Sequence, residues 1–308
     1  MVQPEHIPEF APLENALTVL FCLIDEAYGH LNPKGQRYAA LKRLSDSEVI
    51  TLALFQQLRC VESQRSFLRE VSRFFSHLFP GVVGLHPSSF HRRVRKLRRH
   101  LEPLRRAILP ELVGEPETLL VDSTLLSLLH PRQVPQSAGF PGAAWVRWGS
   151  FSVYGVKLHL LCATNRVPLS YELTPANVAE VGLVEELLAE ANLGEEEVVR
   201  RLLADLAYRS GRLEEDLAEL GIVLVTGRAG RQPGARQQIE IALASLKRVF
   251  GLGETLATTL VGLASRVAAK ITAYTYAFWL TGCWDALKAG SRNCGPKPCN
   301  THLGCILR

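Results

Sequence analysis

Apolar residues recur at helical spacing through the first third of the chain. One such series is Val49, Leu52, Phe55 and Leu58. Ser45, followed by Glu48 three positions later, predicts a capping box where this helix begins. A second helix is predicted from about Ser63 to Phe75, and Pro87-Ser88-Ser89 is a candidate N-cap for a third. We therefore expect an all-helical N-terminal domain over residues 1–114.

From residue 117 the pattern changes to short apolar runs separated by turns, which is typical of strands alternating with helices. The expected strands are Thr118–Asp122, Phe151–Ala163, Val167–Thr174, Val198–Asp205 and Ile222–Thr226, and the expected helices are Val178–Ala191, Gly211–Leu220 and Arg236–Lys247. This order predicts an α/β domain over residues 115–282, with a mixed sheet flanked by helices. The apolar stretch Thr255–Leu280 contains Arg266 and Lys270, so we expect a core helix and no membrane span.

Positive charge is concentrated in one segment. The net charge is +5, yet residues 89–106 hold eight Lys or Arg against the single acid Glu102. The cations expected to bind a polyanion are Arg92, Arg93, Arg95, Lys96, Arg98 and Arg99. Such a basic helix in a helical domain indicates a DNA-binding domain.

Length and cysteine content constrain the setting. A chain of 308 residues can bury a core without disulfides. Cys22, Cys60 and Cys162 stand singly in apolar segments, as reduced buried thiols do, which favours a cytoplasmic location. The cysteines of residues 283–308 lack the paired spacing of zinc sites, and we expect a loosely ordered tail there. Phosphate-binding loops, dinucleotide fingerprints and serine-nucleophile elbows are absent from the sequence.

Three acidic residues are candidates for a metal site. Asp122 and Asp205 each close an apolar run that reads as a buried strand, and Glu240 lies in the predicted helix Arg236–Lys247. Carboxylates from separate elements are suited to hold two Mg²⁺ or Mn²⁺ ions for phosphoryl transfer, because these ions prefer oxygen ligands. The spacings of four and seven residues put Arg236, Glu240 and Lys247 on one side of the helix. Arg236 could then clamp a phosphate, and Lys247 could contact a DNA end.

Other polar and aromatic positions carry two interpretations each. Lys157 and His159 alternate onto one face of their strand, where they could contact DNA or support Asp122, and a structural histidine is an equal alternative. His130 is either a loop residue or part of the same edge. Trp145 and Trp148, beside Arg147, could stack on unpaired bases or fold back as a hydrophobic lid.

These features occur in the order found in one known family. The motifs are Val121-Asp122-Ser123-Thr124, Tyr154-Gly155-Val156-Lys157-Leu158-His159, Leu173-Thr174-Pro175-Ala176-Asn177-Val178, Ala204-Asp205-Leu206-Ala207-Tyr208, and Arg236 with Glu240 and Lys247. Over roughly residues 45–281 the chain resembles bacterial insertion-sequence DDE transposases. The resemblance implies an RNase H-like fold, a helical domain that binds the element's ends, and catalysis by divalent metal at Asp122, Asp205 and Glu240.

Two positions depart from the family's pattern. Pro233 stands where the family usually has a tyrosine, and Leu206-Ala207-Tyr208 replaces the common Lys-Gly-Tyr. Arg209 is close enough in sequence to replace the missing lysine. The departures put activity in question more than fold.

The resulting hypothesis is a transposase that binds terminal inverted repeats, cleaves the flanking phosphodiester and joins the freed 3′-hydroxyl to target DNA. Its expected partners are double-stranded DNA and a second copy of the chain, in the bacterial cytoplasm on the nucleoid, without a membrane. One alternative is a catalytically inactive DNA-binding relative, such as a repressor or a decayed copy. Another is an RNase H-like nuclease without strand transfer.

Overall fold

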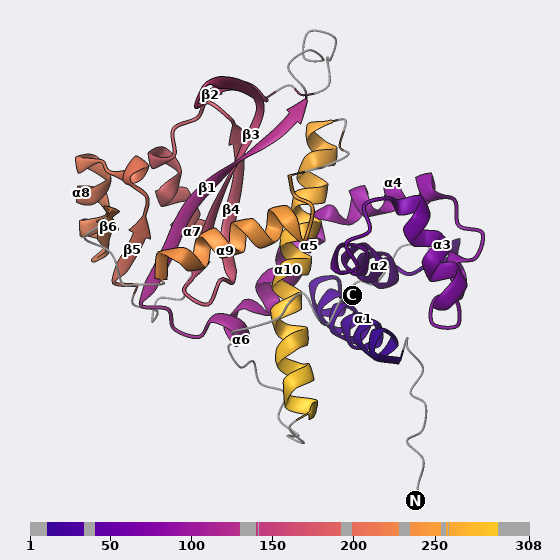
Figure 1. The fold of residues 1–308 in the computed structure, drawn as a ribbon. Coiled ribbons are helices and arrows are strands. Elements are labelled where there is room, and N and C mark those ends of the chain that lie inside the picture. The colour runs from indigo at the N-terminus through magenta and orange to yellow at the C-terminus, as the bar shows by residue number, and fades with distance from the viewer. Residues whose placement is uncertain are drawn as a thin grey trace, which may run out of the picture. The chain divides into compact units, whose positions relative to one another are not determined.

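The computed structural model describes residues 11–33, 41–129, 140, 142–191, 199–227, 235–253, 257 and 259–288. The chain divides into two compact units (Figure 1). The helical unit comprises Met1–Ile108 together with Ala268–Arg308, and the sheet unit comprises Leu109–Val267. The long helix α10 (Leu260–Lys288) contributes residues to both units. The domain ranges expected from the sequence stay predictions, but residues 268–282 group with the helical unit.

The N-terminal region is helical, as expected. Its elements are α1 (Ala11–Leu31), α2 (Asp46–Leu58), α3 (Gln64–Phe74), the 3-10 turn η2 (Pro80–Val82), α4 (Pro87–Leu97), the 3-10 turn η3 (Arg98–His100) and α5 (Leu101–Ala107). The capping box at the start of α2 is confirmed, because the Glu48 N–H donates to Ser45 Oγ at 3.0 Å and the Ser45 N–H donates to the Glu48 carboxylate. Local sequence therefore sets where α2 begins.

Two details of the basic helix differ from expectation. The N-cap of α4 is His86, whose Nδ1 accepts from the Ser88 N–H at 3.2 Å, while Pro87 occupies the first helical turn. Proline fits there because its missing N–H would have no helical partner. The basic run also does not form one continuous helix, since η3 separates α4 from α5.

The core of the helical unit combines aliphatic and aromatic side chains. Phe55 packs edge-on against Phe75 with 5.8 Å between ring centroids, and both are fully buried. From α10, the Tyr276 hydroxyl donates to the Leu104 carbonyl at 3.1 Å. Lys270 Nζ lies 2.7 Å from Glu62 Oε1 although its side chain is only 1% exposed. The second half of α10 is thus an integral part of this unit.

The sheet unit has the predicted mixed sheet. Its elements are α6 (Leu109–Val113), β1 (Thr118–Leu129), β2 (Ala144–Trp148), β3 (Phe151–Ala163), β4 (Pro168–Pro175), the 3-10 turn η5 (Val181–Leu183), α7 (Val184–Ala191), β5 (Arg201–Ala204), the 3-10 turn η6 (Leu206–Tyr208), α8 (Gly211–Glu219), β6 (Val223–Thr226) and α9 (Ala235–Arg248). The strands follow the order β3, β1, β5, β6, with β2 and β4 both paired to β3. Strand β3 is antiparallel to β1 and β4, whereas β5 and β6 run parallel to β1. This mixed arrangement is the expected RNase H-like one.

Strand β1 does not end at Asp122, which corrects the expected strand end there. It continues to Leu129 because the 13-residue strand β3 supplies partners along its whole length, from Leu119↔Ala163 to Leu129↔Tyr154. Strand β2 was not among the expected strands. Gly155 of β3 pairs with Ala144 of β2. There is no room for a side chain at Gly155, because an added Cβ would lie 2.1 Å from the Leu126 carbonyl oxygen.

Helices cover the two faces of the sheet. Ser170 Oγ donates to the Leu187 carbonyl of α7 at 2.6 Å, so α7 lies on the face that carries Ser170. Helix α9 packs against β1, and Figure 1 shows it in front of the sheet with α7 behind. Successive side chains of β1 therefore point alternately toward these two helices.

Two further observations concern environment. Within the described ranges no helix is long and apolar enough to cross a membrane. Cys22, Cys60 and Cys162 are free thiols, as expected, but only Cys162 is buried. The two exposed cysteines correct the expectation that all three lie in the core, because each falls on an outward-facing position of its segment.

Candidate active site and nucleic-acid interface

The register of the sheet brings Asp122 and Asp205 to neighbouring positions. The parallel pairing of β1 with β5 runs Thr118↔Arg201, Leu119↔Leu202 and Leu120↔Leu203. Two residues further along each chain stand Asp122 and Asp205, where β5 ends and Asp205 becomes the cap of η6. Residues in parallel register present their side chains to the same face. Both aspartates are half-buried and so remain accessible from solvent.

Glu240 comes from a different element, as expected. It is exposed on α9, the helix that packs against β1. Among the described residues, however, no group of three His, Cys, Asp or Glu side chains is close enough to hold a metal ion. The two aspartates fit a hard divalent cation in donor chemistry and placement. Convergence of Glu240 on them stays a prediction.

The basic positions of α9 are placed only in part. Arg236 lies in the helix, but its side chain is outside the described set. Lys247 is half-buried, and burial lowers the pKa of its ammonium below the ordinary value. Their expected contacts with DNA stay predictions.

A polar cluster that the sequence did not reveal lies on the α7 face of β1. Ser123 Oγ donates to Glu180 Oε1 at 2.7 Å, and Lys157 Nζ approaches the same oxygen at 3.2 Å. Lys157 also donates to the Val178 carbonyl at 3.1 Å. Its ammonium thus has two protein acceptors, and its predicted DNA contact is untested. The available signal for Glu180 was its position two residues after the Leu173–Val178 motif.

His159 is buried beside this cluster. Its Nε2 lies 2.9 Å from Thr174 Oγ1, while its buried Nδ1 has no hydrogen-bond partner among the residues that the structure describes. Burial lowers the pKa of His159 to about 4, and the nearby Lys157 ammonium adds to the decrease while Glu180 opposes it. The imidazole is therefore neutral at pH 7, which favours the structural interpretation of this histidine.

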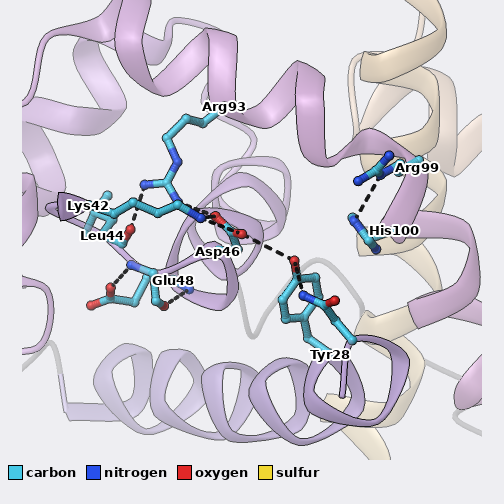
Figure 2. Close-up of polar contacts among 10 residues, drawn as sticks. Tyr28, Lys42, Leu44, Asp46, Glu48, Arg93, Arg99 and His100 are labelled. Carbon is cyan, nitrogen blue, oxygen red and sulfur yellow. Dashed lines mark hydrogen bonds and ion pairs between the residues drawn. The ribbon is translucent and has the colours of Figure 1, made fainter. Parts of the chain in front are cut away.

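The cations of the basic segment have two different roles in the helical unit. The exposed ones are Arg92, Arg95, Lys96, Arg98 and Arg99. Arg93, by contrast, donates to the Leu44 carbonyl at 2.7 Å and to Asp46 Oδ1 at 2.5 Å (Figure 2). It fixes α4 to the start of α2, so its guanidinium already has two protein acceptors, and its expected contact with DNA stays a prediction.

Asp46 is the centre of that junction. It accepts hydrogen bonds from Lys42 at 3.0 Å and from the Tyr28 hydroxyl at 3.3 Å, in addition to Arg93 (Figure 2). Burial favours its neutral form, but the Lys42 and Arg93 hydrogen bonds outweigh burial and lower the pKa of Asp46. Further along the segment, Arg105 and Arg106 both pair with Glu102, at 2.6 and 3.0 Å.

A second row of cations was missed. Arg65, Arg69 and Arg73 are exposed along one side of α3, at spacings of four residues, and α3 packs against α4. The sequence signal was the i, i+4 spacing of these three arginines, in a basic run that is shorter and less dense than residues 89–106. These arginines and the exposed cations of α4 and η3 are grouped under one name, the α3/α4 basic surface.

An aromatic group lies on the β2–β3 hairpin. Trp145 stands opposite Tyr154, with ring centroids 5.4 Å apart, and remains 44% exposed. Arg147 lies two residues along the same strand and is exposed. Neither expected role is excluded by this arrangement. His130, Pro233 and the tail cysteines Cys294, Cys299 and Cys305 lie outside the described residues, as does the side chain of Trp148.

Comparisons with known proteins agree with this geometry. The family described as "Transposase DDE domain" matches residues 114–230, a segment that includes Asp122, Asp205 and Glu180 but ends before Glu240. No curated protein is significantly similar in sequence.

Solved structures show weaker similarity. A piggyBac transposase synaptic complex with hairpin DNA is 12% identical, with a TM-score of 0.41, 92% of this chain covered and 77% of that chain. A Mos1 mariner paired-end complex with Mn is 10% identical, with a TM-score of 0.31 and coverages of 88% and 87%. The assignment rests on the sequence match: residues 114–230 of this chain match the transposase DDE domain family.

Proposed function

We propose that this protein is the transposase of an insertion sequence, which binds the terminal inverted repeats of its element and cleaves and joins DNA strands. The supporting observation is the parallel register that sets Asp122 beside Asp205 inside the segment matched by the DDE domain family. The bacterial setting, on the nucleoid, stays part of this proposal.

In this proposal Asp122, Asp205 and Glu240 hold two divalent cations, Mg²⁺ or Mn²⁺. When bound, the ions would activate the attacking oxygen and stabilise the leaving oxygen of the phosphodiester. The protein's own contribution is to hold the carboxylates at fixed positions on a rigid sheet and one helix. Lys247, half-buried on α9, would lie along the DNA end that enters the site, and Arg236 would hold a phosphate.

DNA binding is assigned to the α3/α4 basic surface. Exposed cations gain affinity from phosphate chiefly by releasing counterions, and each neutralised phosphate adds about 0.9 to the slope of log affinity against log salt. With eight exposed Lys or Arg on this surface, affinity should fall steeply with salt. We expect a homodimer on DNA, because two element ends must be handled together.

The test uses duplexes carrying the inverted repeats that bracket the coding region, incubated with the full chain and Mg²⁺. Nicking at the repeat end is expected for the wild type and should be lost in Asp122→Ala and Asp205→Ala. Asp216→Ala is the matched control, because Asp216 forms a surface pair with Arg212 at 3.5 Å, and such pairs contribute little. Nicking that persists in Asp122→Ala would refute the assignment.

The same experiment separates the alternatives. A catalytically inactive relative, favoured by the 60% exposed Leu206 next to Asp205, predicts salt-sensitive binding without nicking. A nuclease without strand transfer predicts nicking, but no joining when a precut 3′-hydroxyl end is mixed with supercoiled target DNA.

A further inference from the structure

The polar cluster on the α7 face is built from three separate elements. Ser123 comes from β1, Lys157 from β3, and Glu180 from the segment that precedes η5. The side chains of Lys157 and Glu180 are only 13% and 20% exposed. Because burying charges is costly, this pair persists only where its hydrogen bonds are satisfied, here by Ser123 and the Val178 carbonyl.

The cluster is connected to Asp122 by a short path. The Ser123 N–H donates to Asp122 Oδ1 at 2.7 Å, while the Ser123 hydroxyl donates to Glu180. Because Glu180 holds the Ser123 hydroxyl, it also restrains Ser123, whose backbone N–H orients the Asp122 carboxylate. Alternation of β1 puts Ser123 toward α7 and Asp122 toward α9, so Glu180 supports the site from the opposite face of the sheet.

Tyr208 supports the same arrangement from the Asp205 side. It follows Asp205 by three residues and is fully buried, and its hydroxyl lies close to Ser123, Glu180 and both aspartates. Burial, followed by the charges of Glu180 and Asp122, raises the pKa of this phenol. The neutral phenol therefore lies buried beside the polar cluster, three residues after Asp205.

We infer that Glu180 and Lys157 form a positioning pair for Asp122, acting through Ser123. This inference rests on the proposed function and assigns Lys157 to support of the site in place of DNA contact. Groups that orient a metal-binding residue typically change metal affinity or activity by about 10- to 100-fold when removed. The expected effect is of that size, because carboxylates must be held within about 0.5 Å of their productive positions.

The experiment measures Mn²⁺ binding to the full chain bound to an end duplex, by the electron paramagnetic resonance signal of free Mn²⁺, alongside nicking kinetics. Glu180→Ala should raise the Mn²⁺ dissociation constant about 10-fold or more and lower kcat, with KM for DNA unchanged within about two-fold. Glu180→Gln, which keeps an acceptor for Ser123, should recover part of the loss. Glu185→Ala is the matched control, because Glu185 is an exposed glutamate on the neighbouring helix α7.

A double-mutant cycle tests the route through Ser123. If Glu180 acts only by holding Ser123, adding Glu180→Ala to Ser123→Ala should change Mn²⁺ binding little beyond Ser123→Ala alone. If the two substitutions instead raise the Mn²⁺ dissociation constant independently, so that their fold-changes multiply in the double variant, the route through Ser123 is overturned. If Glu180→Ala binds Mn²⁺ and nicks DNA as Glu185→Ala does, the inference as a whole is overturned. Thermal unfolding of each variant verifies its fold, and Glu180→Gln provides the same comparison if Glu180→Ala does not fold.

Failure of the proposed function has a different signature. A wild-type protein that neither binds Mn²⁺ nor nicks end duplex overturns the proposed function and this inference together. A wild type that does both, with unaltered Glu180 variants, overturns the inference alone.

Discussion

Acidification should destabilise the sheet unit through His159. The imidazole is fully buried on β3, with one ring nitrogen near Thr174 and the other without a partner among the described residues. Burial lowers its pKa in the folded state to about 4, against 6.5 in the unfolded chain. The unfolded state therefore takes up a proton first as pH falls, so stability is present above pH 6.5 and is lost between 6.5 and 4.

The magnitude follows from those two pKa values. A separation of 2.5 pH units corresponds to at most about 3 kcal/mol. Proton linkage gives a loss of about 1 kcal/mol between pH 7 and 5.5, and about 2 kcal/mol by pH 4.5. Because Lys157 contributes to the lowered pKa, removing that ammonium should reduce the loss.

The assay is urea unfolding at several pH values, followed by hydrogen-exchange mass spectrometry of β1 and β3 peptides, which reports on the sheet unit. Wild type is compared with His159→Gln, which cannot titrate, so that contributions from other acids cancel in the difference. The free energy of unfolding of the wild type, minus that of the variant, should fall by about 2 kcal/mol between pH 7 and pH 4.5. Parallel stability curves for the two proteins would refute the buried, neutral imidazole.

Two other predictions concern the helical unit. Arg93→Ala should lower the free energy of unfolding by about 1–3 kcal/mol, because Asp46 and the Leu44 carbonyl lose a part-buried charged donor. Arg95→Ala should leave stability nearly unchanged but reduce the slope of log DNA affinity against log salt by about 1. Equal losses of stability in the two variants would contradict the different roles given to Arg93 and Arg95. Glu62→Ala should cost about 2 kcal/mol in urea unfolding, because it takes the carboxylate from the buried Lys270 ammonium, whereas adding Lys270→Met should recover much of that loss. A double variant that is less stable than Glu62→Ala would count against this account of the pair.

Some features of the candidate site could be predicted from local sequence. The capping box at Ser45, the hairpin from Phe151 to Pro175 and the helix around Glu240 depend on residues within a few positions of each other. Asp205 was recognisable for the same reason, since a carboxylate directly follows a short apolar strand. These patterns were sufficient to predict the fold class, the strand that precedes Asp205 and the helix that carries Glu240.

Other features depend on contacts between distant residues. Asp122 lies within β1 and not at its end, because β3 supplies partners far past that position. Glu180 reaches Ser123 across 57 positions, and Arg93 reaches Asp46 across 47. Neither of these two contacts is visible in a local sequence pattern. In the sequence alone, a lysine or arginine that pairs with another part of the protein therefore looks the same as one that is exposed and able to bind DNA.

The sequence by itself determined the order of helices and strands, the acids that end or interrupt them, and the charge of residues 89–106, because periodicity and composition are local properties. Only the tertiary structure decided the pairing register that sets Asp122 beside Asp205, which cations stay exposed, and which buried groups support the site from behind. Strand register and side-chain partners are selected by the packing of whole elements, so they are fixed only when the chain has folded.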